Sequence, residues 1–137
     1  MRLLIQRVRH AKVDVDNQTV GSIGPGILAF LGITHADSFA DATYLASKLV
    51  NLRMFHDQEE KMNLSLLDVQ GSVLIVSQIT LYADCSEGRR PSFTYAAPPS
   101  HSEPLYNHFV TEVRKTNVPT ATGIFGANMQ VSLLNDG

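Results

Sequence analysis

The stretch Ile27-Leu28-Ala29-Phe30-Leu31-Gly32-Ile33 decides the fold class. It is continuously apolar and short, which is typical of a β-strand buried on both faces. Gly24-Pro25-Gly26 directly before it indicates a turn. A second apolar run, Val73-Leu74-Ile75-Val76, has the same character and lies in a segment, 72–82, that we expect to be extended. The sequence therefore predicts a sheet with two buried strands.

Further strands are expected on both sides of these two runs. Residues 2–16 alternate imperfectly, with Val13 and Val15 on one side and acidic residues on the other, as in a strand with one solvent-facing side. A turn at Asn17-Gln18 would lead into a return strand over 19–23. We also expect an extended segment over 52–56 and a last strand over 130–134.

Two amphipathic helices are predicted. Residues 39–52 have apolar residues at helical spacing behind a capping-box pattern, Ser38 with Asp41. A second helix is expected behind the capping box of Ser100 and Glu103, with Pro104 in its first turn and its end near Lys115. Leu105, Phe109, Val110 and Val113 form its apolar stripe. Two helices are too few to connect every strand pair, so we predict an α+β domain with a mixed or antiparallel sheet.

Composition indicates one globular domain spanning residues 1–137. The chain has 137 residues and a net charge of −2, and 44% of its residues are hydrophobic. These values exclude a disordered tail and a coiled coil. No apolar stretch approaches the roughly 20 residues of a membrane span. A single cysteine, Cys85, fits a reducing compartment, so we expect a cytoplasmic protein.

Common catalytic motifs do not occur in the sequence. The five histidines show no metal-ligand spacing, and there is no phosphate-binding glycine motif and no GxSxG nucleophile motif. We therefore expect neither a metal nor a cofactor.

Three other segments could carry chemistry. Ser77-Gln78-Ile79-Thr80-Leu81 could present hydroxyl and amide groups to a cleft, with Gln78 and Thr80 on one face of a strand, or could simply satisfy neighbouring backbone groups. Arg89 and Arg90, before Phe93, suit phosphate contact and base stacking, although arginines on loops are often only solvated. Gly123-Ile124-Phe125-Gly126-Ala127 could be a tight turn or a place where a ligand approaches the backbone.

The sequence resembles the bacterial D-aminoacyl-tRNA deacylases, also called D-tyrosyl-tRNA deacylases, from end to end. The shared signatures are the Ser-Gln-x-Thr-Leu element at 77–81 and the closing Asn135-Asp136-Gly137. Matching stretches also include Met1-Arg2, Gln6-Arg7-Val8, Ala11, Lys61-Met62-Asn63, Ser65, Gly88-Arg89-Arg90-Pro91-Ser92-Phe93, Leu105-Tyr106, Thr122-Gly123-Ile124-Phe125-Gly126-Ala127, Met129 and Val131-Ser132-Leu133-Leu134.

The resemblance implies a barrel-like sheet with two main helices, and a homodimer with active sites at the subunit interface. It implies hydrolysis of the ester between a D-amino acid, or glycine mischarged on tRNA-Ala, and the terminal adenosine of tRNA, with rejection of L-aminoacyl-tRNA. Ser77, Gln78 and Thr80 would form the catalytic segment. Phe125 and Met129 would bind substrate, and Arg89 and Arg90 would contact tRNA. Thr80 is a candidate nucleophile, but no histidine in the signatures would act as its base, so the 2′-hydroxyl of the tRNA is the alternative.

Chiral selection in the resembled family depends on a Gly-Pro pair after Asn-Asp, inserted into the partner's pocket. Gly137 occupies the glycine position, and Arg7 would brace that loop. The family continues there with Pro-Val-Thr, so we expect the natural chain to continue past Gly137. Glu87 stands where many members carry Lys. Two other functions compete with the editing enzyme: a non-catalytic aminoacyl-tRNA-binding module, and a small-molecule esterase.

Overall fold

The fold is built around one long hairpin at the N-terminus of the computed structural model, which describes residues 1–137. Strand β1 (Arg2–Val15) pairs antiparallel with β2 (Gln18–Ile23) and with β3 (Gly26–Gly32). Asp16 and Asn17 turn the chain between β1 and β2 with φ values of 49° and 62°, as the two-residue loop of a tight hairpin requires. The turn therefore lies one residue earlier than predicted.

The sheet is mixed, as the sequence predicts. Its strand order is β2-β1-β3-β6-β7, and β8 (Gln130–Asn135) pairs antiparallel with β1. The parallel pairs join β3 to β6 (Ser72–Ser77) and β6 to β7 (Thr120–Thr122). A Cβ on Gly21 in β2 would overlap the carbonyl of Thr122 in β7, so the two edges of the sheet meet closely and the sheet is barrel-like.

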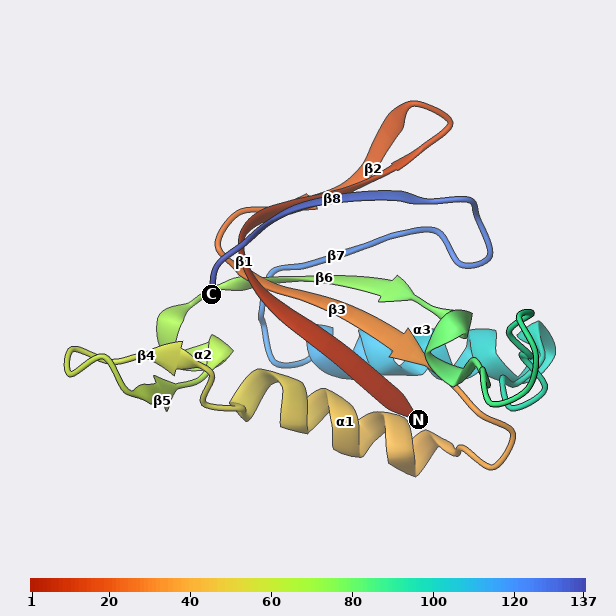
Figure 1. Ribbon diagram of the computed structural model, residues 1–137. Coiled ribbons are helices and arrows are strands. Elements are labelled where there is room, and N and C mark those ends of the chain that lie inside the picture. The colour runs from red at the N-terminus through yellow and green to blue at the C-terminus, as the bar shows by residue number, and fades with distance from the viewer.

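The two long helices, α1 (Phe39–Asn51) and α3 (Pro99–Arg114), cover the same side of the sheet (Figure 1). They pack with the buried sides of β3 and β6 into the larger of two apolar clusters. The predicted capping box of α1 is present, since the Asp41 carboxylate accepts a hydrogen bond from the Ser38 backbone N–H at 2.8 Å. Helix and sheet therefore share one continuous core.

The second apolar cluster lies on the other side of the sheet. It contains Val8, Ala11, Val13, Leu28, Leu74 and Val76, with Met129 and Val131 packed against it. The molecule thus has apolar contacts on both faces of β3 and β6, which explains why both sequence runs are continuously apolar. No helix of the structure is long and apolar enough to cross a membrane.

A small hairpin extends from one end of the molecule, on the left in Figure 1. It consists of β4 (Phe55–His56) and β5 (Met62–Leu64) and leads into the single-turn helix α2 (Leu66–Val69). Ser65 and Asp68 cap α2 reciprocally. The extended segment expected over 52–56 is a strand only at its last two residues.

The sequence prediction was wrong at two element boundaries. Strand β6 ends at Ser77, and the chain then forms a 3₁₀ turn, η1 (Ile79–Tyr82), so the expected strand over 72–82 is too long. Helix α3 begins at Pro99, not behind a capping box at Ser100, because the Pro98 carbonyl already accepts hydrogen bonds from the backbone N–H groups of His101 and Ser102. Pro104 consequently lies inside α3 and not in its first turn.

Candidate active site

A cavity of about 360 Å³ opens where β3 and β6 end. This volume is within the range of pockets that hold small molecules. Four residues from the predicted set line the cavity, namely Ser77, Gln78, Phe125 and Met129. Most of the remaining lining is aliphatic, including Leu31, Val76 and Val131. The cavity is therefore apolar, with its polar groups concentrated at the end of β6.

The end of β6 is held tightly against β3. The Gln78 N–H donates to the Leu31 carbonyl at 2.8 Å. A Cβ on Gly32 would lie 2.8 Å from Leu81 Cβ and 3.2 Å from the Gln78 carbonyl oxygen. Glycine at position 32 therefore lets η1 approach β3, and this approach places Gln78 beside the cavity.

Thr80 lies next to Gln78 although the two do not share a strand face. The Gln78 side-chain Nε2 donates a hydrogen bond to the Thr80 hydroxyl oxygen. The 3₁₀ turn brings the two side chains together, not the strand alternation that the sequence suggested. None of the histidine hydrogen bonds in the structure involves Thr80; His101, for example, bonds to the carbonyl of Asp37. Thr80 thus has an amide partner and no general base.

Backbone donors accompany these side chains. The N–H groups of Ile79 and Thr80 open η1, so they have no acceptor within that turn. Ile79 also lines the cavity. Amide donors of this kind can stabilise negative charge on a substrate oxygen.

A second part of the cavity wall is the connection between β7 and β8. The Gly123 N–H donates to the Ile75 carbonyl at 3.1 Å, and the Ala127 N–H closes a turn on the Ile124 carbonyl at 3.1 Å. Gly126 has φ 76°, a left-handed conformation that favours glycine. The Met129 sulfur lies so close to the position that a Cβ of Gly123 would take that the two atoms would overlap. The segment is therefore a tight turn and also a cavity wall.

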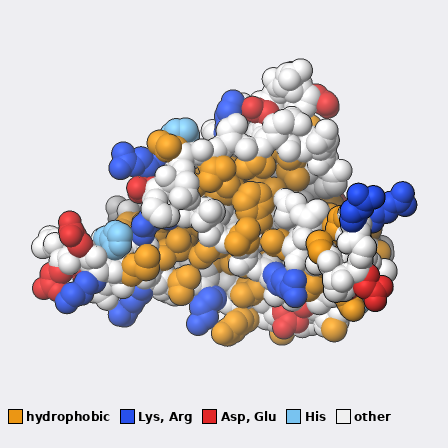
Figure 2. Space-filling model, viewed as in Figure 1, with side chains coloured by type: hydrophobic (Ala, Val, Ile, Leu, Met, Phe, Trp, Pro, Cys, Tyr) orange, Lys and Arg blue, Asp and Glu red, His pale blue; other side chains and the backbone are white.

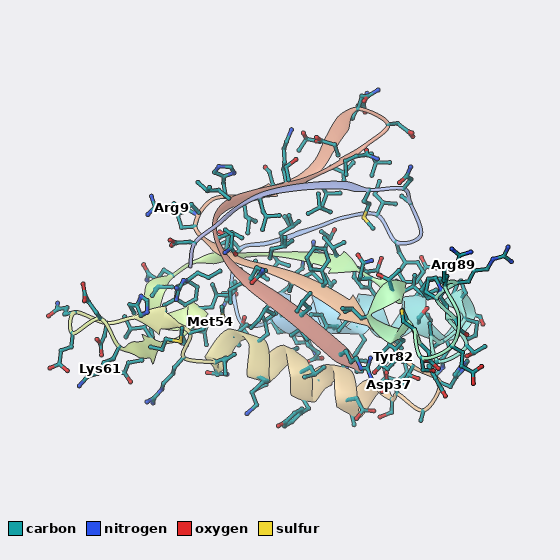
Figure 3. All side chains as sticks on the ribbon, in the orientation of Figure 1. Arg9, Asp37, Met54, Lys61, Tyr82 and Arg89 are labelled. Atoms are coloured by element: carbon teal, nitrogen blue, oxygen red, sulfur yellow. The ribbon has the colours of Figure 1, made fainter.

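Arg89 and Arg90 lie on a long loop between η1 and α3. The loop is closed by two backbone hydrogen bonds between Asp84 and Ser92, of 2.8 and 2.9 Å. Both arginines are exposed and form no salt bridge. Figure 3 shows Arg89 pointing away from the body of the molecule. The same loop reaches the cavity at Ala97, and neither Arg89 nor Arg90 lines the cavity.

Arg7 and Gly137 do not lie at this cavity. Arg7 Nε donates to the Asp136 carbonyl at 2.7 Å, and its Nη1 donates to the Met54 carbonyl at 2.5 Å. Gly137 has φ 98°, and a Cβ there would lie 2.5 Å from Arg7 Nη2. The C-terminus in Figure 1 is near the β4–β5 end of the sheet, away from the end of β6. Arg7 and Gly137 are therefore brought together, but apart from the other site residues.

Sequence reasoning missed cavity residues from α3. Pro99 and the buried Ser102 line the cavity, and the Ser102 hydroxyl donates to the Pro98 carbonyl at 3.1 Å. The sequence pattern did not reveal them, because the predicted capping box placed Ser102 in the first turn of the helix and outside its apolar stripe. No group of three or more His, Cys, Asp or Glu side chains is arranged to hold a metal ion.

Comparison with known proteins identifies the family. The sequence model of the family described as D-Tyr-tRNA(Tyr) deacylase matches residues 4–137.

The chain belongs to the D-Tyr-tRNA(Tyr) deacylase family.

Curated members of this deacylase family are similar over the whole chain. The D-aminoacyl-tRNA deacylase of Thermosipho africanus is 54% identical over 137 residues, which are 92% of that protein. The corresponding protein of Chloroflexus aurantiacus is 56% identical, and the chain covers 86% of it.

Solved structures share the fold of this chain. A structure titled c-Myc DNA Unwinding Element Binding Protein is 37% identical and matches with a TM-score of 0.92, covering 99% of this chain and 93% of that one. A probable eukaryotic D-amino acid tRNA deacylase, 18% identical, has the same fold with a TM-score of 0.82 over 98% of this chain and 94% of that one.

Proposed function

We propose that this deacylase family member hydrolyses the ester that joins a D-amino acid to the terminal adenosine of tRNA, releasing free tRNA and the D-amino acid. The observation that carries the proposal is the end of β6, where Ser77, Gln78 and Ile79 line an apolar cavity and the amides of Ile79 and Thr80 have no acceptor within η1. An aminoacyl ester brings one carbonyl that becomes an oxyanion, and these groups are suited to receive it. The names of the relatives support the same reaction.

The proposed chemistry uses no covalent enzyme intermediate. A water molecule attacks the ester carbonyl, the resulting tetrahedral oxyanion is held by backbone amides, and the 3′-oxygen of the adenosine leaves with a proton. The Thr80 hydroxyl accepts a hydrogen bond from Gln78 and has no base beside it, so it is a poor nucleophile. We assign assistance of the attacking water to the neighbouring 2′-hydroxyl of the substrate. The protein then contributes position and electrostatics.

We further propose that a second copy of the chain completes each site by inserting Gly137. Support comes from the separation of two groups of residues within one chain: Gly137 and Arg7 lie apart from the cavity, while Ser77, Gln78, Phe125 and Met129 line it. A glycine backbone without Cβ could hydrogen-bond the α-ammonium group of the substrate and exclude an L side chain. Glycyl-tRNA would not be excluded in this way, because glycine has no side chain.

Surface chemistry supports a homodimer. Hydrophobic side chains gather across the middle of the molecule between β8 and α1 (Figure 2). Leu4 in β1 and Leu134 in β8 are 52% and 47% exposed. An apolar surface of this kind is typical of a face that another protein covers, and a twofold pair would bring each Gly137 toward the other copy.

Arg89 and Arg90 would bind phosphates near the 3′ end of tRNA, because they are exposed, form no salt bridge and lie on the loop that reaches the cavity at Ala97. We propose that residues 1–137 act as one deacylase domain, without a metal or another cofactor. Because its substrate would be tRNA, we propose that it works in the cytoplasm.

Mixed variants test the two-copy site. Gly137→Val and Gln78→Ala should each lose deacylation of D-Tyr-tRNA, and mixed dimers should recover about a quarter of wild-type activity, because half the random dimers are hybrids with one intact site. Absence of recovery, with hybrids verified by mass spectrometry, would contradict the shared site. Binding of aminoacyl-tRNA by the wild type without any ester loss would instead support a non-catalytic binding module.

A further inference from the structure

One backbone carbonyl joins three elements beside the cavity. The Ile75 carbonyl in β6 accepts a hydrogen bond from the Gly123 N–H at 3.1 Å and a second from the Tyr106 hydroxyl at 2.9 Å. Gly123 begins the β7–β8 connection that forms one cavity wall, and Tyr106 lies in the middle of α3. The Ile75 carbonyl oxygen of β6 therefore links α3 and the β7–β8 cavity wall to the same strand.

The ring of Tyr106 also contacts that wall directly. Its centroid lies 5.7 Å from the centroid of Phe125, with an angle of 54° between the ring planes. Phe125 lines the cavity, whereas Tyr106 does not. Ser77, which also lines the cavity, is only two residues after Ile75 in the same strand. Tyr106 is thus placed to control the spacing between Phe125 and the Ser77–Gln78 segment.

The hydroxyl of Tyr106 has one chemical state near neutral pH. Burial raises the pKa of Tyr106 to about 12, so the phenol stays protonated and remains a hydrogen-bond donor. A group that neither touches the cavity nor titrates in this range has no role in proton transfer. The Tyr106 hydroxyl can instead keep the groups that it contacts in a fixed position.

We propose that Tyr106 is a positioning residue for the deacylation reaction. It acts through the Ile75 carbonyl and the Phe125 ring, and it holds the Phe125–Met129 wall at a fixed separation from Gln78 and the open amides of η1. This inference rests on the proposed function. Displacement of a reacting group by a fraction of an ångström is enough to slow a reaction that depends on orientation.

Tyr106→Phe tests the hydroxyl while retaining the ring. Thr116→Val is the matched control, because it also removes one hydroxyl hydrogen bond, from Thr116 to the Val113 carbonyl at the far end of α3. With D-Tyr-tRNA, we expect Tyr106→Phe to lower kcat by about tenfold and to change KM by less than about twofold. Thr116→Val should leave both constants near wild type.

Methionine methyl resonances give a readout that does not require activity. Met129 is in the wall, whereas Met62 is in the remote β4–β5 hairpin. Tyr106→Phe should shift or broaden the Met129 methyl signal and leave Met62 unchanged, and Thr116→Val should leave both in place. An unchanged Met129 signal, or equal kcat losses in the two variants, would overturn the positioning role. If wild type left D-Tyr-tRNA intact, the proposed function would fail, while the methyl signals would still decide whether Tyr106 positions the wall.

Discussion

Two hydrogen bonds join Arg7 to the backbone of Asp136. The Arg7 side-chain Nε donates to the Asp136 carbonyl at 2.7 Å, and the Asp136 N–H donates to the Arg7 carbonyl at 2.8 Å. The same guanidinium reaches the Met54 carbonyl before β4. One side chain thus fixes the end of β8 next to Gly137, the residue to which we assign chiral selection.

Arg7→Lys should weaken this brace, because a lysine ammonium cannot reproduce the fork that reaches both carbonyls. We expect a loss of about 1–3 kcal/mol in the free energy of unfolding and a lower rate ratio between D-Tyr-tRNA and L-Tyr-tRNA. Urea unfolding and deacylation kinetics measure the two effects. The control is Arg9→Lys, since the salt bridge of Arg9 is a partly exposed one with the Asp136 carboxylate at 3.6 Å. This substitution should change stability little. Equal behaviour of the two variants would remove the special role of Arg7.

Thr80→Ala should reduce deacylation only modestly, by less than about tenfold, because the hydroxyl is not the nucleophile. A substrate that ends in 2′-deoxyadenosine should be hydrolysed far more slowly by the wild type. Quenched reactions followed by intact-mass measurement would reveal any acyl-enzyme. A covalent aminoacyl adduct on Thr80 would refute the proposed mechanism.

Arg89→Ala and Arg90→Ala should weaken tRNA binding without changing the D-to-L rate ratio, since phosphate contacts position a nucleic acid and do not select the amino acid. Each substitution should flatten the log–log salt dependence of binding by about 0.7–0.9. Filter binding at several salt concentrations measures this slope. If the slope stayed at the wild-type value, the two arginines would be merely solvated.

Gly32→Ala should displace η1, because the new methyl group would lie 2.8 Å from Leu81 Cβ. We expect destabilisation by about 1–3 kcal/mol together with loss of activity, as Gln78 moves from its place. Gly24→Ala is the control, because nothing lies within 4 Å of a Cβ at that position. Thermal unfolding and deacylation assays should separate the two variants; similar effects from both would show that close packing at Gly32 is unimportant.

The capping box of α1 should make the free energy of unfolding depend on pH in the acidic range. The Ser38 backbone N–H and hydroxyl hold the pKa of the Asp41 carboxyl below its ordinary value. A lowered pKa means that this contribution is present above about pH 4 and is lost as the pH falls through the lowered value. Asp41→Asn should therefore be less stable than wild type near neutral pH, and the difference should shrink at about pH 3. A difference independent of pH, measured by urea unfolding, would contradict this.

Burial explains which parts of the fold the sequence predicted correctly. The run at 27–33 and the stripe of Leu105, Phe109, Val110 and Val113 are buried in the structure, so their patterns directly reflect the core. Strand β7 was not predicted because its three residues form a strand only by pairing with β6, which lies far away in the sequence. The same applies to β5, which exists only as the partner of β4.

The candidate site was predicted unevenly for a similar reason. Family resemblance identified Ser77, Gln78, Phe125 and Met129, and the structure brings these four to one cavity. Strand periodicity failed after Ser77, the last residue that pairs with β3 through Leu31, because no partner continues the ladder and the chain coils into η1. Tyr106 was noted only within a matching stretch; its importance depends on contacts with Ile75 and Phe125 that no local pattern encodes.

The most direct test of the proposed function is the rate of ester loss from D-Tyr-tRNA and L-Tyr-tRNA, each incubated separately with the purified protein and followed by release of labelled tyrosine. We predict rapid hydrolysis of the D ester, with the L ester lost no faster than in buffer. Equal hydrolysis of both esters would contradict chiral selection, and persistence of the D ester would contradict the proposed reaction itself.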